Sequence, residues 1–287
     1  MPPLPPSHSV ESETQPSLVI EAGRASRHYW RDLYRYRELF YFLAWRDLLV
    51  RYKQTVIGVA WAVLRPVLTM VVFTIIFGKM AKLPDGGIPY PILVFSAMLP
   101  WQFFANALSE SSGSLVSNAN LVSKIYFPRM ILPASSVIVA LVDFAISFAL
   151  LLLLVAIYQF PLPWTFLALP GFILLAFLAA LGPGLLITAL NVKYRDFRYV
   201  VPFIVQMGLY ISPVGFRSDV VPEQWRLVYS LNPMVGVIDG FRWSIGGPDA
   251  AALYLPGFWL SIVIVAANLF LGIWYFRRTE RQFADVI

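Results

Sequence analysis

The sequence predicts an all-α integral membrane protein with six transmembrane helices, and three observations support this fold class. Apolar residues make up 59% of the 287 residues and charged residues only 13%, whereas soluble domains average roughly 45–50% (glycine included) and about 25%. The mean hydropathy of the chain is +0.69. Six apolar stretches reach the length of about 20 helical residues that crosses a bilayer. They are residues 56–78, 91–113, 131–158, 164–190, 199–216 and 254–276.

One of these spans is expected to be irregular. Gly182-Pro183-Gly184 lies near the end of the fourth span. Because proline lacks an N–H group and crowds the preceding turn, this sequence predicts a kink or an unwound turn. Together, residues 56–276 are expected to form a six-helix transmembrane domain.

The composition also excludes several kinds of site. The chain has no cysteine, so it has no disulfide framework and no thiolate metal site. Its two histidines, His8 and His28, both lie in the polar N-terminal region. Few residues are therefore available to bind zinc or haem or to take part in histidine-based catalysis. We therefore expect this chain to bind no metal and no cofactor.

The distribution of lysine and arginine predicts the orientation in the membrane. If the N-terminus is cytoplasmic, the inner segments carry 16 of these residues and the outer segments five, and Arg65 lies within the first span. Cytoplasmic loops carry an excess of basic residues, so both termini are expected to be cytoplasmic. Residues 1–28, with four prolines in the first six positions, are expected to form a disordered cytoplasmic tail. Residues 277–287 are expected to form a cytoplasmic C-terminal tail.

Before the first span, residues 29–55 are predicted to form an amphipathic interface helix. Aromatic and apolar side chains recur at spacings of three and four between Trp30 and Tyr52, as on one face of a helix. A basic helix of this kind suits the inner membrane surface, where cations meet anionic headgroups. Its basic residues include Arg35, Arg46, Arg51 and Lys53. Two interpretations stay open, a passive anchor or a docking element for a cytoplasmic partner.

A short helix is predicted in the loop between spans two and three. Ser117, Asn118 and Asn120 are good N-cap residues, and Pro128 prevents continuation. Val122, Ile125 and Tyr126 have the i, i+3, i+4 spacing of one helical face, and Lys124 and Arg129 supply charge. The loop is either a simple reversal of the chain or a lever that fits a groove on another protein.

Outside the membrane, residues 217–248 form a segment that is long and apolar for a loop. Two short re-entrant helices are predicted, residues 222–231 and 233–245. Asn232 and Pro233 read as the N-cap and the first position of the second helix. Their aromatic residues are Trp225, Tyr229, Phe241 and Trp243. The two helices are either an aromatic belt at the outer interface or a lid over a pathway.

Polar residues within the spans are sparse and therefore informative. Arg65 and Asp143 are the clearest, since a charge at the bilayer centre costs roughly 2.5–3.5 kcal/mol on insertion scales. Each should face protein, water or a partner, unless it snorkels to the membrane surface. Span two offers a stripe of small or polar residues, which indicates either a cavity or close helix contacts. The stripe is Gln102, Asn106, Ser109, Glu110 and Gly113.

The loop NVKYRDFRYVVP sets Lys193, Arg195, Asp196 and Arg198 among aromatic residues. Interleaved arginine and aromatic residues can bind nucleic acid. Here the cations flank two spans, so we interpret them as the basic residues of a cytoplasmic loop. No nucleic-acid partner is expected.

Five runs occur in one order along residues 45–245: YKQTVIGVAWAVLRPVLTM, IPYPILVFSAMLPWQFF, SKIYFPRMILP, NVKYRDFRYVVPF and SLNPMVGVIDGFRW. They resemble the membrane subunits of type 2 ABC exporters that carry polysaccharides out of bacteria, most closely the permeases of lipid-linked O-antigen export. The resemblance implies a homodimer of permeases in the inner membrane, joined to two cytoplasmic ABC ATPase subunits. It also implies a glycan cargo on undecaprenyl pyrophosphate that moves through the dimer interface. Residues 1–30 match no motif of the family.

The resemblance assigns roles to the segments above. The interface helix would lie beside the ATPase. The extracytoplasmic helices would form an outer gate that contains Trp225, Tyr229, Asn232, Pro233, Phe241 and Trp243. The loop after span two would be the coupling element that engages the ATPase. Its residues are Asn118, Leu121, Val122, Lys124, Ile125, Tyr126, Phe127 and Arg129.

The residues themselves agree with a transport subunit that depends on another protein for its energy. The Gly78-Lys79 pair is followed by Met80, and residue 73 is not glycine, so the chain lacks a phosphate-binding GxxxxGK[ST] loop. ATP and Mg²⁺ are therefore expected on a partner subunit. Aromatic rings can pack against the apolar faces of sugars, which suggests channel candidates among aromatic and polar residues of the spans. These are Trp61, Arg65, Trp101, Phe103, Phe104, Asn106, Glu110 and Asp143.

Other functions have less support. A membrane-bound transferase would need clustered acids or a base, but the acidic residues are scattered over both sides. An ion-coupled carrier would usually show inverted repeats and several interior carboxylates. Asp143 is one such carboxylate, and by itself it gives this function little support. The same architecture could instead export capsule, teichoic acid, or a cargo that is not a glycan.

Overall fold

The computed structural model describes residues 29–53 and 56–283, without the side chains of residues 56–62, and all regular secondary structure within these residues is helical. Among the described residues, five helical stretches are long and apolar enough to cross a membrane: 63–80, 90–117, 131–157, 164–193 and 255–282. The tail predicted for residues 1–28 lies outside the described residues, as does the end of the C-terminal tail, residues 284–287.

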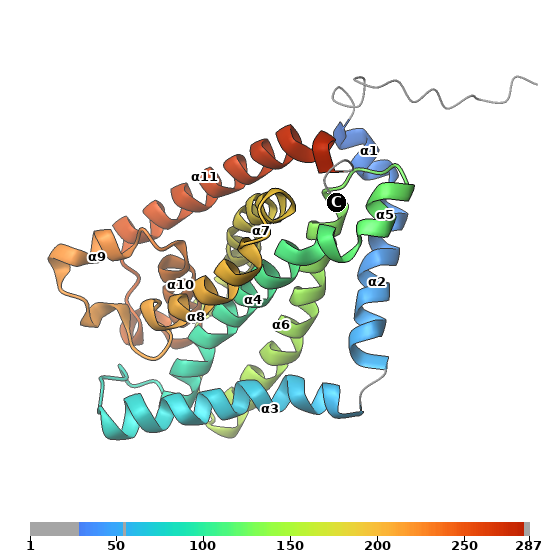
Figure 1. The fold of residues 1–287 in the computed structure, drawn as a ribbon. Helices are drawn as coiled ribbons and strands as arrows, with labels where there is room; N and C mark the ends of the chain where they lie inside the picture. Colours follow the sequence, from blue (N-terminus) through green and yellow to red (C-terminus); the bar gives the residue numbers. More distant parts are fainter. Residues whose placement is uncertain (1–28, 54–55, 284–287) are drawn as a thin grey trace, which may run out of the picture.

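The helices occur in the order expected from the apolar stretches (Figure 1). The chain begins with α1 (Tyr29–Arg35) and α2 (Arg37–Lys53), and α3 (Val56–Phe73) continues into a π-helical stretch, η2 (Thr74–Met80). The central elements are α4 (Tyr90–Ser117), α5 (Ala119–Lys124), α6 (Ile131–Ile157), η3 (Trp164–Ala168) and α7 (Leu169–Lys193). The last are α8 (Phe197–Ile211), η4 (Ser218–Val220), α9 (Glu223–Tyr229), α10 (Pro233–Ala250), α11 (Leu255–Thr279) and η5 (Glu280–Gln282).

The predicted fifth span is shorter than expected. α8 has 15 residues, or about 22 Å at 1.5 Å per residue, and it ends where Ser212 takes an extended conformation before Pro213. Six crossings therefore remain a prediction.

α4 is the centre of the bundle. It packs against α6, α7, α8, α10 and α3, and it is at once the most buried and the least hydropathic of the five candidate spans. The two properties belong together, because a helix surrounded by protein does not need a lipid-facing apolar surface. The polar stripe predicted on this span is therefore tolerated by protein contacts.

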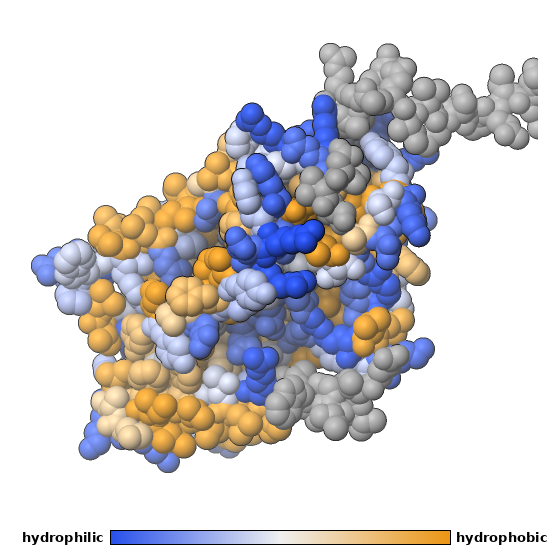
Figure 2. Space-filling view, in the orientation of Figure 1, coloured by the Kyte–Doolittle hydropathy of each residue, from blue (hydrophilic) through white to orange (hydrophobic). Residues whose placement is uncertain are grey.

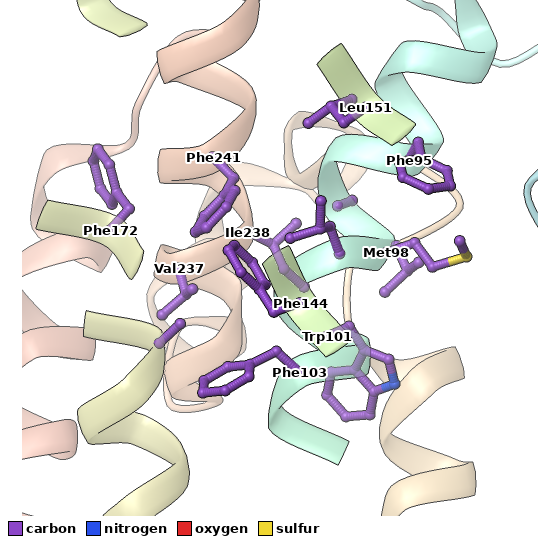
Figure 3. Close-up of a cluster of buried hydrophobic side chains, with 14 of the residues drawn as sticks. Phe95, Met98, Trp101, Phe103, Phe144, Leu151, Phe172, Val237, Ile238 and Phe241 are labelled. Carbon is purple, nitrogen blue, oxygen red and sulfur yellow. The ribbon is translucent and has the colours of Figure 1, made fainter. Parts of the chain in front are cut away.

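A buried aromatic cluster joins α4 to α6, α7 and α10 (Figure 3). Phe103 of α4 lies 5.7 Å from Phe144 of α6, and Phe144 lies 6.1 Å from Phe241 of α10, measured between ring centroids. Both pairs are edge-on, an arrangement that adds about 0.5–1.5 kcal/mol to the burial of each pair.

α7 is continuous through Pro183, so the predicted unwound turn is wrong. Close packing holds this turn in helical form. A Cβ on Gly182 would meet the backbone of Leu269 at 2.7 Å, and one on Gly184 would meet Ser111 Oγ at 2.7 Å. The two glycines thus let α7 approach α11 on one side and α4 on the other.

The predicted interface helix is two helices that meet at Tyr36. The backbone hydrogen bonds Tyr36 N to Asp32 O (2.9 Å) and Phe40 N to Tyr36 O (3.0 Å) continue across the junction. α1 turns toward α11, where the Tyr29 hydroxyl donates to Glu280 (3.3 Å). α2 crosses the end of the bundle that carries α5 (Figure 1) and packs against α6.

Candidate functional site

The loop after α4 contains the predicted short helix, α5, but Asn118 does not cap it. The Asn118 side chain donates to Ser114 O (2.9 Å) and accepts from the Arg46 guanidinium (2.9 Å). The prediction of a side-chain N-cap is therefore wrong for Asn118. Because α4 ends at the preceding residue, this amide instead ties the α4–α5 junction to α2.

The predicted apolar face of this loop is divided. α5 ends at Lys124, and Ile125 is extended, so the spacing of a helix no longer applies. Val122 is 3% exposed, whereas Ile125 and Tyr126 are each 54% exposed. The exposed residues Lys124, Ile125 and Tyr126 form a projecting surface, which we call the α5 tip.

The base of this loop is fastened to the end of α11. The backbone N–H of Arg129 donates to Glu280 Oε1 (2.7 Å), and the Arg129 guanidinium donates to the Glu280 carbonyl. Arg129 therefore anchors the loop. Val122 and Phe127 are buried beneath the tip in an apolar cluster, and Leu121 packs against it. The other buried members are Tyr29, Leu43, Leu115, Met130, Ile131, Leu132, Leu185, Ala189, Val192, Phe276 and Phe283.

A charged cavity lies between α2, α3, α4 and α6. Arg51 of α2 forms ion pairs with Glu110 of α4 and Asp143 of α6, and the Tyr52 hydroxyl also donates to Asp143. The cavity measures about 310 Å³. It brings together Arg51 and five of the channel candidates, which are Arg65, Phe103, Asn106, Glu110 and Asp143.

This arrangement decides how Asp143 avoids lipid. The sequence leaves open a snorkelling carboxylate, but the structure gives Asp143 a guanidinium and a phenol as partners. Such pairing offsets the cost of removing a carboxylate from water. Arg35 and Lys53, also predicted on the interface helix, are exposed.

The predicted aromatic channel residues are mostly packed inside one copy of the chain. Trp101 and Phe103 are buried, and a Cβ on Gly208 would meet the Trp101 ring at 2.4 Å, so this ring is wedged between α4 and α8. Phe104 is partly buried against the same core. The Trp61 side chain lies outside the described residues. Neither Trp101 nor Phe103 faces a surface that a second copy could share.

The aromatic residues that are exposed on α8 are not among the site residues predicted from the sequence. Tyr199, Phe203 and Tyr210 all present their rings at the surface. Their spacing of four and seven residues places them on one side of the helix. This spacing was the available signal that the three rings share one face of the helix, although it does not tell whether that face is exposed.

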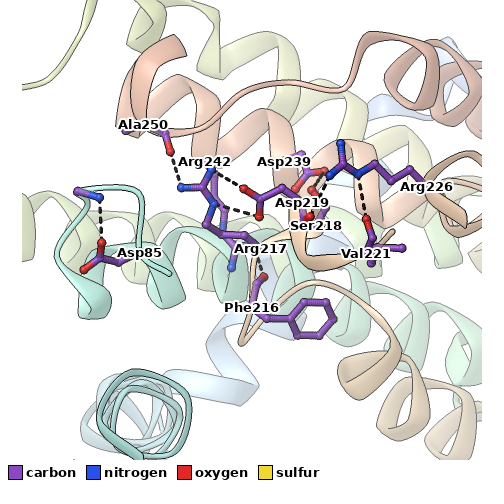
Figure 4. Close-up of polar contacts among 11 residues, drawn as sticks. Asp85, Phe216, Arg217, Ser218, Asp219, Val221, Arg226, Asp239, Arg242 and Ala250 are labelled. Carbon is purple, nitrogen blue, oxygen red and sulfur yellow. Dashed lines mark hydrogen bonds and ion pairs between the residues drawn. The ribbon is translucent and has the colours of Figure 1, made fainter. Parts of the chain in front are cut away.

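At the other end of the molecule, Arg242 of α10 is buried. It is 3% exposed and donates to the carbonyls of Phe216 (2.7 Å), Val214 (3.0 Å) and Leu93 (3.3 Å). These bonds hold the chain after α8 against α4 and α10. Arg242 is part of the polar network drawn in Figure 4.

The same network contains a buried carboxylate, Asp239, which accepts a hydrogen bond from the Ser218 hydroxyl (2.6 Å). Burial raises the pKa of Asp239 to about 6, although the Ser218 bond and the Arg242 charge oppose this shift. Burial lowers the pKa of Arg242 to about 10, against the opposing effect of Asp239. Both residues lie on α10, which is not one of the candidate spans.

The residues of the predicted gate separate into exposed and buried groups. Trp225 is exposed on α9, and Trp243 lies 6.1 Å from Trp164 between ring centroids. Phe241 is fully buried and packs on Phe144 in the aromatic cluster, so it does not face the outer surface. Tyr229 donates to Ile211 O (2.7 Å) and thereby links α9 to the end of α8.

The predicted start of α10 is confirmed. Asn232 is the N-cap, with its side-chain oxygen accepting from Met234 N (3.1 Å), and Pro233 occupies the first turn. The Asn232 amide also donates to Ser212 Oγ (2.9 Å). Gly247, at φ 84°, breaks the helical conformation near the predicted end.

We expect the stability of this end of the molecule to depend on the charge of Asp239. Its pKa rises from 3.8 to about 6 on folding, so between these values the native state binds more protons than the unfolded state. Stability then falls as pH rises through this window and levels off above it. The two-unit shift corresponds to about 3 kcal/mol. Asp239→Asn should abolish this pH dependence of the melting temperature in detergent.

The control is Asp249→Asn, which changes an exposed carboxylate of the same helix, α10. This variant should retain the wild-type fall between pH 4 and pH 6. An equal pH dependence in Asp239→Asn and wild type would contradict the assignment to Asp239.

These features define an all-helical integral membrane protein with a projecting helical loop at one end. Residues 38–245 match the family described as ABC-2 type transporter, and the chain belongs to this family. It is 29% identical over 216 residues to the O-antigen export system permease protein RfbA of Myxococcus xanthus, covering 74% of this chain and 82% of the relative.

Two further relatives cover more of the chain. The RfbA permease of Klebsiella pneumoniae is 25% identical over 249 residues, covering 84% of this chain and 92% of the relative. The capsule polysaccharide export inner-membrane protein CtrC of Neisseria meningitidis is 24% identical over 255 residues, covering 85% and 90%. These relatives are transport proteins by name.

Proposed function

We propose that this chain is the transmembrane subunit of an ATP-driven exporter that carries a lipid-linked polysaccharide across the bacterial inner membrane. Membership of the ABC-2 family and the names of the O-antigen export relatives support this function. The structural observation that carries the proposal is the α5 tip, an exposed surface on a firmly anchored base.

The anchoring makes the α5 tip suitable for transmitting movement. Asn118 connects its root to α2 through Arg46, and Arg129 connects its base to the end of α11. The helix that precedes α5 is α4, which contacts five other helices of the bundle. A displacement of the α5 tip would therefore be transmitted to α4, at the centre of the bundle.

The proposed source of that displacement is a pair of cytoplasmic ABC ATPase subunits. The sequence contains no GxxxxGK[ST] loop, so ATP and Mg²⁺ would bind to the partner. This proposal places both termini, α5 and the basic α2 in the cytoplasm, in agreement with the excess of basic residues on that side.

We further propose that α8 makes the sixth crossing and that α9 and α10 form a re-entrant pair on the outer side. A second copy would pack against α3 and α8, which both contact α4 and both carry many exposed apolar residues. The glycan would pass between the two copies. Tyr199, Phe203 and Tyr210 are better placed to contact it than Trp101 or Phe103, because sugar rings can slide over exposed aromatic faces.

Charge reversal at the α5 tip tests this function. Lys124→Glu, combined with Ile125→Ala and Tyr126→Ala, should abolish both polysaccharide at the cell surface and stimulation of the partner ATPase by the permease. These side chains are exposed, so the variant should still insert and reach wild-type levels in the membrane. Both activities should be measured in the complex of permease and ATPase.

The matched control is Lys79→Glu, which reverses an exposed lysine at the end of η2. This control should export normally. Arg129→Glu should behave differently from both, with loss of protein from the membrane, because it removes the bond from the Arg129 guanidinium to the Glu280 carbonyl. Normal export and ATPase stimulation in the tip variant would overturn the proposed coupling role.

The CtrC relative favours capsule polysaccharide as a second candidate cargo. Deletion of the gene distinguishes the two possibilities by the polymer that disappears from the surface. Accumulation of the missing polymer on undecaprenyl pyrophosphate inside the cell would support the proposed lipid carrier. Normal surface glycan would contradict both candidates.

A further inference from the structure

The charged cavity at Arg51 is balanced in charge, but a second cavity is not. This second cavity measures about 560 Å³, within the roughly 300–1,000 Å³ range of small-molecule sites. Its walls are the end of α4, the first residue of α5, the end of α7 and the start of α8. Figure 2 shows hydrophilic residues in the middle of the molecular face that α4, α7 and α8 occupy in Figure 1.

The cations of this cavity come from the loop after α7 and from the first turn of α8, which hold Arg195 and Arg198 respectively. Arg195 and Arg198 both line it, and neither guanidinium has a side-chain partner in the part of the chain that the structure describes. Among the described residues, no carboxylate lines this cavity. The cavity at Arg51 differs, because Glu110 and Asp143 neutralise that guanidinium. An unbalanced pair of guanidinium groups selects an anion, and guanidinium groups bind phosphate well.

The remaining polar groups offer hydrogen-bond acceptors. Ser109 and Ser112 of α4 donate their hydroxyl protons to the carbonyls of Ala105 (2.8 Å) and Ser109 (2.7 Å), which leaves their oxygen lone pairs available. Asn191 donates its amide to Ser112 O (2.8 Å) and keeps its side-chain oxygen as an acceptor. These groups suit a ligand rich in hydroxyl donors. The exposed Tyr199 ring at the rim of the cavity adds a face for a sugar ring.

We infer that this cavity binds a phosphorylated sugar, with its phosphate on Arg195 and Arg198 and its hydroxyl groups on the α4 serines and Asn191. The inference rests on the proposed function, because it assigns a subsite to the phosphate-bearing end of the same cargo. The basic segment that holds the two arginines is then a binding element in addition to marking the cytoplasmic side.

The position of the cavity gives binding a consequence. Ala119, the first residue of α5, is part of its wall, and the neighbouring Asn118 is the amide that holds Arg46. An occupied cavity therefore lies directly against the element proposed to contact the ATPase. Cargo at this site would be sensed at the α5 tip through a single helical junction.

Binding of glucose 1-phosphate to the full chain in phosphatidylcholine nanodiscs tests the site. The double variant Arg195→Gln/Arg198→Gln should weaken binding about ten- to hundredfold, as expected for hydrogen bonds to charged groups. Methyl glucoside, which has no phosphate, should bind weakly to wild type and variant alike. Raised salt should weaken binding to the wild type, since the cations are exposed. The matched control Arg31→Gln, an exposed arginine on α1, should bind as wild type does.

Undecaprenyl phosphate in the same nanodiscs identifies the source of the phosphate. Competition with glucose 1-phosphate would indicate that the site takes the phosphate of the lipid carrier, and lack of competition would indicate a phosphate on the sugar itself. Equal affinity of the double variant and wild type would overturn the site. So would loss of the ATPase subunit from the double variant with unchanged sugar phosphate binding, which would make the arginines a protein-docking surface.

The binding measurement is independent of export. A chain that binds sugar phosphate through these arginines but exports no glycan would support the site and contradict the proposed function. A chain that exports glycan but does not bind sugar phosphate through these arginines would support the proposed function and contradict the site.

Discussion

Replacing Gly272 by alanine is expected to cause one of the largest losses of stability of any single substitution in this chain. Gly272 of α11 faces Gly182 of α7, and a Cβ at Gly272 would lie 2.2 Å from the Gly182 carbonyl oxygen. That oxygen belongs to the backbone of a packed helix, so it cannot move aside as a flexible side chain could. Overpacking typically lowers the free energy of unfolding by about 1–3 kcal/mol. Because the contact here is with rigid backbone, the loss of stability in this variant should reach or exceed the upper end of that range. The melting temperature and the yield of folded protein in detergent should both fall.

The chain provides a close control in Gly171, another helical glycine of α7. A Cβ at Gly171 would meet no atom within 4 Å, and alanine favours a helix over glycine by about 1 kcal/mol. Gly171→Ala should therefore be neutral or slightly stabilising. If the two alanine variants were equally stable, the close approach of α7 and α11 would be wrong.

The second large effect is expected at Arg51. Arg51→Met keeps much of the side-chain length but leaves Glu110 and Asp143 without the guanidinium that pairs with both. Removing one partner of a buried ion pair costs about 3–5 kcal/mol. The side chains here are 20–32% exposed, so water screening should reduce the loss to about 2–4 kcal/mol. The melting temperature should fall accordingly, and α2 should become more accessible to proteases.

A compensating variant makes this prediction specific. Glu110→Gln and Asp143→Asn remove both charges, so adding them to Arg51→Met should recover most of the lost stability. Lys53→Met, two residues away and exposed, should have little effect. A triple variant as unstable as Arg51→Met alone would show that the ion pairs are not the source of the loss.

The charged cavity shows which features of the site could be predicted from the sequence and which could not. Arg65, Glu110 and Asp143 were recognisable because charges are rare within spans, and the physical cost of charge in lipid predicts that each faces protein or water. Their common location was not recognisable. Arg51 lies 92 residues from Asp143 in the chain, and no local pattern relates the two positions.

The loop after α4 gives a similar result. A short helix before Pro128 followed from local signals alone. Which of its residues project did not, since the helix ends at Lys124 and the neighbouring elements bury Val122 and Phe127. Arg129 looked like a surface charge in the sequence, but Glu280, 151 residues later, makes it an anchor.

The sequence by itself determined the helical membrane class, the approximate limits of the apolar helices and the start of α10 at Asn232. These features depend on local chemistry, because a bilayer requires a continuous apolar segment whose backbone hydrogen bonds are satisfied within the helix. Tertiary structure alone decided that α4 is central, that Phe241 and Arg242 are buried, and that Arg195 and Arg198 share a cavity with the α4 serines. Lipid and protein interior are both apolar surroundings, so hydropathy cannot tell which face of a helix meets lipid and which meets another helix.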